Sequence, residues 1–229
     1  MNGTKGNSVA LALALLCFAI PSHPLQISDN IMVLQSKCGS GKQSACKELA
    51  RIAISDPDAK VRSDAAFVLT DQSLLAKIAI NDPNADVRSS AVYQLTDRSL
   101  LARIAAEDKD ADVRNAAKRN LGRMCVDAAR RGDTSAVQTL LTLGADANST
   151  DESGYTALMY ASADGYIEIV QALLNKGANV NVTETDRGYA EGTANGIVIH
   201  QGDTNTALSL ASANGHHEIV EMLLKAGAK

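Results

Sequence analysis

Residues 156–181, TALMYASADGYIEIVQALLNKGANVN, are closely repeated by residues 206–229, TALSLASANGHHEIVEMLLKAGAK. A third and more divergent copy, VDAARRGDTSAVQTLLTLGADAN, occupies residues 126–148. Glycines recur at a 33-residue interval, at Gly132 and Gly165 and again at Gly144 and Gly177. Self-similarity at a fixed period of this length is typical of repeat architectures, in which a short unit buries its apolar face only against its neighbours. The sequence therefore predicts a solenoid.

The residues of these units resemble ankyrin repeats. The middle copy meets the family pattern D-x-x-G-x-T-P-L-H-x-A-A-x-x-G-H-x-x-I-V-x-x-L-L-x-x-G-A-x-x-N at Asp151, Gly154, Thr156, Leu158, Ala161, Gly165, Ile169, Val170, Leu173, Leu174, Gly177, Ala178 and Asn181. It departs from the pattern at Ala157, which replaces the usual Pro, and at Met159, which replaces the usual His. The last copy departs in the same places, with Ala207 and Ser209. The missing His implies the loss of its hydrogen bonds to the backbone.

The resemblance also implies a use. Ankyrin repeats are protein-binding scaffolds, and their contacts come mainly from hairpin tips and from the exposed faces of the first helices. The matching positions in this chain are Glu152, Tyr155, Tyr160, Asp164, Leu210 and Asn214. Exposed tyrosines are good interface anchors, although an ordinary scaffold surface is the alternative reading for each of these residues.

An earlier segment repeats with a different period. RIAISDPDAKVRSDAAFVLTDQSLLA begins at Arg51, KIAINDPNADVRSSAVYQLTDRSLLA at Lys77 and RIAAEDKDADVRNAAKRNL at Arg103, so the period is 26 residues. Apolar residues in each unit recur at helical spacing on two successive faces. Between them, a sequence such as Asp82-Pro83 ends the first helix, because the residue before Pro is disfavoured in the helical conformation. Each unit therefore predicts a pair of helices.

The pattern D-x-x-x-x-VR-x-x-A-x-x-x-L in this segment resembles HEAT-like repeats, with variant leucine-rich repeats as a close competitor. In such families the repeated Arg often pairs with a neighbouring Asp along the stack. Arg62, Arg88 and Arg114 match that position, and the possible partners are Asp82, Asp86, Asp108 and Asp112. A ladder of packing contacts is favoured over a ligand site.

The predicted fold is an all-α repeat solenoid. Residues 23–43 are expected to cap its N-terminal end, residues 44–122 to form HEAT-like helix pairs, and residues 123–229 to form ankyrin repeats with β-hairpin loops, one of them extended. One helix is expected to end near Leu121 and the next to begin near Met124, with no linker between the arrays. Basic residues gather at this junction, at Arg114, Lys118, Arg119, Arg123, Arg130 and Arg131. They indicate either a solvated face or a patch for an acidic partner.

The segment VTETDRGYAEGTANGIVIHQGDTN, residues 182–205, interrupts the ankyrin units. Gly177 and Gly227 lie 50 residues apart, which exceeds the 33-residue period by 17. Strand-like residues at both ends of the segment and turn formers between them predict an extended β-hairpin or a long loop. Insertions in repeat proteins map to loops on one face, often the binding face, and a tolerated insertion without function is the alternative. The candidate contact residues are Arg187, Tyr189, Glu191, Ile197, Ile199 and His200.

The N-terminus has the layout of a secretory signal peptide. MNGTKGN carries a Lys, SVALALALLCFAI is apolar, and PSHP breaks the run,. The run is too short to favour a membrane span, and a buried N-terminal helix is the alternative. Residues 1–22 therefore predict export, periplasmic or secreted, and the chain is cytoplasmic if this run is no signal. In an oxidising compartment, Cys38 and Cys46 are close enough in sequence to form a disulfide.

Composition narrows the function classes. A net charge of −4 argues against general nucleic-acid binding,. No His/Asp/Ser set has the spacing of a nucleophile motif and no Cys/His set has that of a metal site, so no catalytic residue, cofactor or metal is predicted. The chain is expected to be a monomeric, non-enzymatic scaffold that binds another protein through its concave face and hairpin loops. An exported module that inhibits or protects a partner enzyme is the alternative, and a hydrolase is a remote one.

Overall fold

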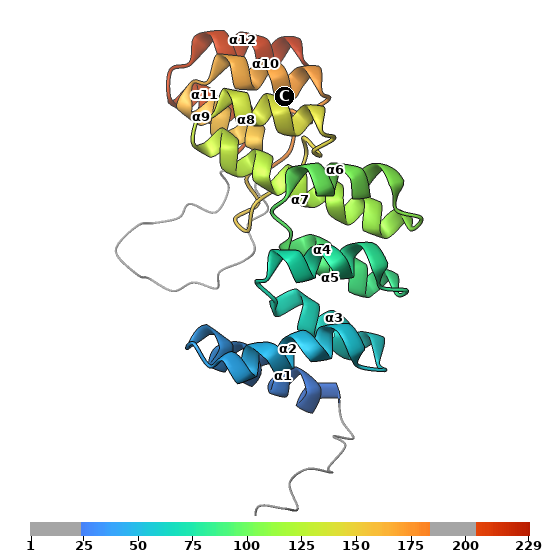
Figure 1. Ribbon diagram of the computed structural model, residues 1–229. Coiled ribbons are helices and arrows are strands. Elements are labelled where there is room, and N and C mark those ends of the chain that lie inside the picture. The colour runs from blue at the N-terminus through green and yellow to red at the C-terminus, as the bar shows by residue number, and fades with distance from the viewer. Residues whose placement is uncertain (1–23, 184–204) are drawn as a thin grey trace, which may run out of the picture.

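The computed structural model describes residues 24–183 and 205–229, and these ranges form twelve helices and no strand. In chain order the helices are α1 (Pro24–Gly39), α2 (Gln43–Ser55), α3 (Ala59–Val68), α4 (Gln72–Asn81), α5 (Ala85–Gln94), α6 (Arg98–Glu107), α7 (Ala111–Arg130), α8 (Thr134–Thr142), α9 (Ala157–Asp164), α10 (Ile167–Asn175), α11 (Ala207–Ala213) and α12 (His217–Lys225). They stack in chain order from α1 at one end to α12 at the other (Figure 1). The predicted all-α repeat solenoid is confirmed.

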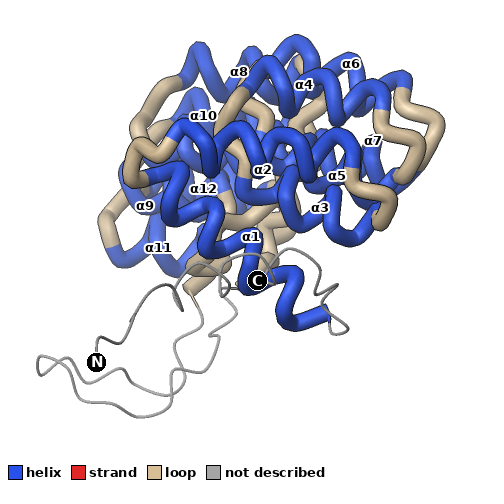
Figure 2. The backbone as a smooth tube through the Cα atoms, turned by 60° about the horizontal axis from the view of Figure 1, so that its bottom comes forward, coloured by secondary structure: helices blue, strands red, loops and turns tan. Residues whose placement is uncertain are grey.

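The stack has two layers of helices. In its N-terminal half, α3, α5 and α7 pack side by side, and α2, α4 and α6 each cover one of them. In its C-terminal half, α9 and α11 continue the layer of α7, while α8, α10 and α12 form the other layer. Figure 2 shows how short the loops are that join most of these helices. A single connected cluster of buried apolar side chains extends from Ile31 in α1 to Leu223 in α12, so the two arrays share one core.

Helix α7 corrects the expected boundary between the arrays. It runs without interruption through the segment where one helix was expected to end near Leu121 and another to begin near Met124. No Pro or capping residue breaks the chain there, and Gly122 alone costs a helix only about 1 kcal/mol. The buried face also continues through the junction, at Ala117, Leu121, Cys125 and Ala128. Tertiary burial on both sides therefore outweighs the local weakness at Gly122, and one helix serves two arrays.

Gly122 has a packing reason of its own. A Cβ atom placed there meets the side chain of Ser149, with the Ser149 Cβ only 2.6 Å away and the Asp146 carbonyl oxygen at 2.7 Å. The backbone N–H of Asp146 donates to the carbonyl of Lys118 on α7 at 3.4 Å. The loop after α8 thus lies directly on the α7 backbone, which only a glycine permits.

Two glycines of the ankyrin units are in close contact with a ring side chain of the following unit. Gly165 has a φ of 80°, and a Cβ there lies 2.7 Å from the His216 ring. Gly132 has a φ of 69°, and a Cβ there lies 2.7 Å from the Tyr166 ring. Tyr166 and His216 occupy equivalent repeat positions, 50 residues apart. The glycine period therefore reflects both a left-handed backbone and this contact between units.

The N-terminal caps of α9 and α11 differ from a second expectation of the sequence analysis. The Thr156 and Thr206 hydroxyls accept from the backbone N–H of the third helical residue, as N-caps do,. In return, the backbone N–H of Thr206 donates to the Ser209 hydroxyl at 2.9 Å, and that of Thr156 meets the Met159 sulfur at 3.4 Å. The expected loss of backbone hydrogen bonds at Met159 and Ser209 is therefore wrong, because both residues contact the N-cap in place of the usual His.

The expected β-hairpin loops contain no strand in the described residues. Between α8 and α9 there is only an isolated bridge, from Thr150 to Thr156. The Asp151 carboxylate accepts from the backbone N–H groups of Ser153 and Tyr155, at 2.9 and 3.0 Å. A side chain thus satisfies the donors that a longer ladder would otherwise pair. The predicted extended hairpin at residues 182–205 lies almost entirely outside the described residues.

Helix α1 closes the N-terminal end of the stack. It packs on α2 and α3, and Ile31 is 3% exposed at that contact. The predicted disulfide between Cys38 and Cys46 is present and joins α1 to α2. Cys125 is buried without a disulfide, and burial raises the pKa of its thiol to about 11.

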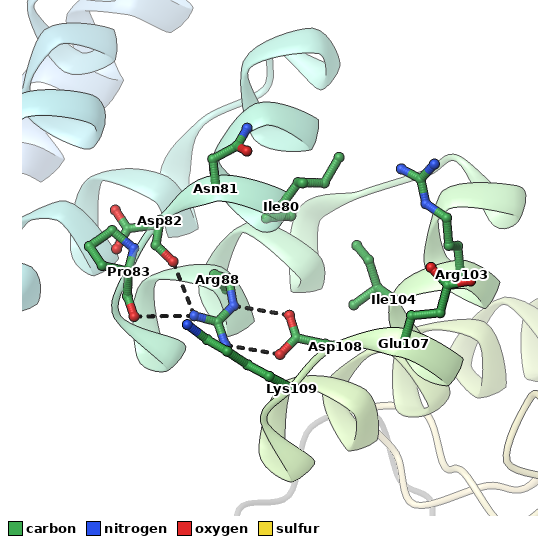
Figure 3. A pocket seen from close by; sticks show the side chains of 11 residues that line it. Ile80, Asn81, Asp82, Pro83, Arg88, Arg103, Ile104, Glu107, Asp108 and Lys109 are labelled. Carbon is green, nitrogen blue, oxygen red and sulfur yellow. Dashed lines mark hydrogen bonds and ion pairs between the residues drawn. The ribbon is translucent and has the colours of Figure 1, made fainter.

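An Arg–Asp ladder holds successive helix pairs together, as the resemblance to HEAT-like repeats implies. Arg62 donates through Nε and Nη2 to the Asp82 carboxylate at 2.9 and 3.0 Å, and Arg88 donates to Asp108 in the same way, at 3.0 and 2.9 Å. Arg88 also donates through Nη1 to the carbonyls of Asp82 and Pro83 (Figure 3). Each arginine thereby ties its own interhelical turn to the next unit.

The ladder selects two of the four possible partners. The carboxylates of Asp82 and Asp108 lie within 3 Å of an arginine, whereas Asp86 and Asp112 lie in the first turns of α5 and α7. Burial raises the pKa of the Asp108 carboxyl. The hydrogen bonds from Arg88 and from the Asp110 backbone outweigh that effect, so the pKa lies below its usual value.

Replacing Arg88 by Met is expected to destabilise the fold by about 3 kcal/mol, because it leaves the largely buried Asp108 carboxylate without its partner,. The folded-state pKa of Asp108 is lowered, so its stabilising contribution is present above about pH 4 and is lost as the pH falls below that value. The free energy of unfolding, measured by urea denaturation, should therefore fall more steeply on acidification in the wild type than in Arg88→Met.

The matched control is Arg51→Met, which breaks the exposed Arg51–Glu48 pair and should reduce the free energy of unfolding much less than Arg88→Met does, because solvent screens this pair,. Equal losses of stability in the two variants, or equal slopes against pH in the wild type and Arg88→Met, would contradict the role given to the ladder.

Candidate protein-binding surface

The helices α7, α9 and α11 pack side by side and present equivalent positions on one inner face. Tyr160 on α9 lies 33 residues after Asp127 on α7 and 50 residues before Leu210 on α11. One turn further along each helix lie Arg131, Asp164 and Asn214, which are all exposed. We call these six positions the inner-face row. They form two parallel lines of side chains that cross three repeats.

A pair of tyrosines forms the most ordered part of this surface. The Tyr155 and Tyr160 rings lie 5.3 Å apart between centroids, tilted by 37°. The Tyr160 hydroxyl donates to the second carboxylate oxygen of Asp151 at 2.7 Å, and the Asn205 amide donates to the Tyr155 hydroxyl at 2.9 Å. Both rings remain partly exposed. The pair is thus held in one conformation before any partner arrives.

The electrostatics of the pair follow from this arrangement. Burial, together with the hydrogen bond to the Asp151 carboxylate, raises the pKa of Tyr160 to about 12. The nearby Arg130 guanidinium opposes the shift. The phenol is therefore a neutral hydrogen-bond donor already engaged with a carboxylate, and its ring is the part of the side chain available for contact.

The structure brings the predicted ankyrin residues together in part. Tyr155, Tyr160 and Leu210 are half-buried, and Asp164 and Asn214 are exposed on the inner-face row. The sixth residue, Glu152, is exposed in the turn that precedes α9, as expected for a hairpin tip. The candidates Arg187, Tyr189, Glu191, Ile197, Ile199 and His200 lie outside the described residues.

Sequence reasoning missed two residues that organise the surface. Asp151 was counted only as a family match, and Asn205 only as the end of the insertion, although they hold the two tyrosine hydroxyls. Arg131 was assigned only to the basic cluster and Asp127 was not singled out, although both belong to the inner-face row. A 33-residue offset from Tyr160 and Asp164 is the signal that identifies them.

The insertion leaves and re-enters the stack at anchored residues. Asn181 donates through its amide to the Gly227 carbonyl at 3.2 Å and accepts from the Lys229 backbone N–H at 3.0 Å. Asn205, at the other end, is held on Tyr155. The described residues that flank the insertion are therefore anchored, Asn181 on the last repeat and Asn205 on the tyrosine pair.

Several members of the basic cluster on α7 have structural partners. Arg123 lies 4.3 Å from the centre of the Tyr93 ring and donates to the Tyr93 carbonyl. Arg130 pairs with Asp127 at 3.4 Å, and Arg114 donates to the Asp108 carbonyl at 2.7 Å. Lys118, Arg119 and Arg131 are exposed. Three members of the cluster therefore take part in structural contacts, and the other three are exposed to solvent.

Among the described residues, no group of three or more His, Cys, Asp or Glu side chains is placed to hold a metal ion. No helix in the same ranges has the length and apolarity to cross a membrane.

Comparison with known families agrees with the repeat geometry. A family model for ankyrin repeats in three copies matches residues 90–186 and 125–229, which together cover more than half of the chain. The chain belongs to the ankyrin-repeat family. The match begins inside the 26-residue array, whose helix pairs are seen in the structure. The assignment of residues 44–122 to HEAT-like repeats stays a prediction.

Similar curated proteins are larger than the matched segment. A putative ankyrin repeat protein, YahD, from Escherichia coli K12 is 41% identical over 63 residues, which are 28% of this ankyrin chain and 31% of YahD. The ankyrin repeat, SAM and basic leucine zipper domain-containing protein 1 of Carollia perspicillata is 44% identical over 54 residues, 24% of this chain and 11% of that protein. The aligned segments thus span less than a third of either relative.

Replacing Tyr160 by Phe tests the hydrogen bond to Asp151. The lost bond should cost about 1 kcal/mol near neutral pH. A raised folded-state pKa stabilises the protein below the unfolded value of about 10, and that contribution is lost as the pH rises toward the folded value. The free energy of unfolding, measured by urea denaturation between about pH 9 and 11, should therefore fall more with pH in the wild type than in Tyr160→Phe.

The control for this experiment is Tyr93→Phe, at a ring that is 45% exposed. Its pH dependence should match that of the wild type. A Tyr160→Phe variant that loses stability with pH as steeply as Tyr93→Phe would show that the Asp151 contact does not form.

Proposed function

We propose that this ankyrin-repeat protein is a non-enzymatic scaffold that binds another protein through the inner face of α7, α9 and α11. The observation that carries the proposal is the Tyr155–Tyr160 pair, held by Asp151 and Asn205 beside the inner-face row. The general use of ankyrin repeats as protein-interaction modules supports it. Two helix layers supply a rigid surface whose side chains lose little freedom on binding.

The composition of the surface indicates how a partner is recognised. Interface energy concentrates in a few well-packed aromatic or apolar anchors surrounded by polar residues. Tyr155, Tyr160 and Leu210 are the partly exposed anchors of this kind, with Asp164 and Asn214 beside them. A partner that covers the ring faces and meets this polar margin fits the surface best.

We propose that the insertion at residues 182–205 adds to the same surface. Its C-terminal anchor, Asn205, is bonded to Tyr155. This contact of the flanking residue supports a role of the insertion in binding the same partner. The candidates Arg187, Tyr189, Glu191, Ile197, Ile199 and His200 therefore belong to the proposal.

Affinity capture from a lysate of the source cells tests this surface. The double variant Asp164→Lys/Asn214→Lys changes two exposed inner-face positions without altering the core and should reduce partner capture at least tenfold. The matched control is Glu168→Lys/Glu218→Lys, which changes the equivalent exposed positions of the outer helices α10 and α12 and should capture normally. Deletion of residues 184–203 should keep the helical circular dichroism and lose the partner. Normal capture by the inner-face variant would refute the proposed surface.

We also propose that the chain is exported and that its partner is an exported protein. The Cys38–Cys46 disulfide supports this, because disulfides persist in oxidising compartments,. An inhibitory or protective role toward a partner enzyme fits such a location.

Intact-mass spectrometry tests the export proposal on the chain expressed with its own N-terminus in a bacterial host. The periplasmic fraction should contain a product that lacks the first residues, up to about residue 22, and that resists alkylation at Cys38 and Cys46 until it is reduced. A full-length chain confined to the cytoplasm, with both thiols open to alkylation, would refute export.

A further inference from the structure

The Arg–Asp ladder ends on an arginine that has no carboxylate partner among the described residues. Arg88 binds Asp108, the C-cap residue of α6, and the preceding ladder arginine binds the C-cap residue of α4 in the same way. Arg114 occupies the next equivalent position, 26 residues after Arg88. The next helix of the outer layer is α8, and its C-cap residue is Leu143. The residue that would complete the ladder is therefore apolar.

The guanidinium of Arg114 is nevertheless held as in the occupied pairs. Its Nη1 donates to the carbonyl of Asp108, six residues earlier, at 2.7 Å. Arg88 makes the same bond to the carbonyl of Asp82 at 3.0 Å, while its Nε and Nη2 donate to a carboxylate (Figure 3). The Nε and Nη2 of Arg114 have no acceptor among the described residues, and the side chain is half-buried. They form a positioned pair of open donors, which we call the Arg114 fork.

The nearby carboxylates of the chain are engaged elsewhere. Asp146 is the first acidic residue after α8, and its backbone N–H donates to the carbonyl of Lys118, one turn beyond Arg114 along α7. Its carboxylate accepts from the backbone N–H two residues later, at 2.9 Å. Asp110 caps the start of α7 by accepting from two backbone N–H groups. The loop after α8 thus meets α7 one turn too far along for its acid to continue the ladder.

The chemistry of the missing group follows from the two occupied pairs. Each holds a side-chain carboxylate with both oxygens, at N–O distances of 2.9 and 3.0 Å. A guanidinium matches a carboxylate in this two-pronged way, and a charged group that is partly removed from water gains most from such a partner. Lys118, one turn further along α7, is exposed and forms no ion pair within the described ranges. The surroundings of the Arg114 fork therefore include a second free cation.

We propose that the Arg114 fork binds the carboxylate of an Asp or Glu side chain on a partner protein, which completes the ladder from outside the chain. The carboxylate accepts from Nε and Nη2 of Arg114, with Lys118 beside it. Arg114 lies 13 residues before Asp127 of the inner-face row, a distance of about 20 Å along the helix. The site is therefore separate from that row, and the proposal does not depend on the function proposed for it.

Nuclear magnetic resonance of the isotope-labelled full chain tests the site through the Nε–Hε signals of its arginines. The probe is the blocked peptide acetyl-Gly-Asp-Gly-amide, titrated at constant ionic strength. We expect the Arg114 signal to shift to saturation, at least fivefold further than that of exposed Arg119. The signals of Arg62 and Arg88 should stay in place, because their donors are already occupied. The matching Asn peptide should cause no saturable shift.

The Arg114→Lys variant keeps the charge and removes the fork, so it should weaken binding of the Asp peptide at least tenfold, measured from the Lys118 backbone amide. The matched control is Arg119→Lys, which changes an exposed arginine of the same helix and should bind like the wild type. Thermal unfolding followed by circular dichroism confirms that each variant is folded. The arginine signals of the wild type report on the site even where a variant does not fold.

Three results overturn the proposal: an Arg114 signal that moves no further than that of Arg119, equal shifts with the Asn peptide, or equal weakening by the two Lys variants. Sodium acetate and inorganic phosphate are the comparison probes. Saturable binding of acetate without binding of the Asp peptide would assign the Arg114 fork to a free small carboxylate. Tighter binding of phosphate than of the Asp peptide would assign it to a phosphate group. Either outcome overturns a partner's acidic side chain as the ligand.

Discussion

Helix α7 must satisfy two packing partners with one backbone. Its first half packs on α5 and α6, and its second half packs on α8 and α9, so it belongs to an array with a period of 26 residues and to one with a period of 33. A helix that changed direction at the junction would expose the buried face that runs from Ala117 to Ala128. The straight continuation keeps one core through the whole stack, and Gly122 lets the following loop lie against the helix backbone.

The two arrays join their units by different means. In the N-terminal array, buried Arg–Asp pairs connect each interhelical turn to the next unit. In the ankyrin array, ring side chains from one unit pack on left-handed glycines of the unit before it. Charged contacts require specific partners in a precise geometry, whereas the glycine contacts require the absence of a side chain. Both therefore leave a strict period in the sequence.

The face proposed to bind a partner depends on contacts between distant segments. The ankyrin inner face is polar and aromatic, with its tyrosine hydroxyls held by Asp151 and Asn205. One cluster of buried apolar side chains connects the helices of this face to the N-terminal array.

Local sequence patterns determined the helical repeats, their two periods, the N-caps, the cysteine pair and the arginine positions of the ladder. Each of these depends on residues close in sequence or at a constant offset, and such regularities survive without knowledge of the fold. Tertiary structure alone decided that α7 is continuous, that Asp82 and Asp108 rather than Asp86 and Asp112 accept the arginines, and that Asp151 and Asn205 hold the tyrosine pair. Those outcomes depend on burial and on contacts between distant segments, where several partners have the right chemistry and only the packing of the helices selects one.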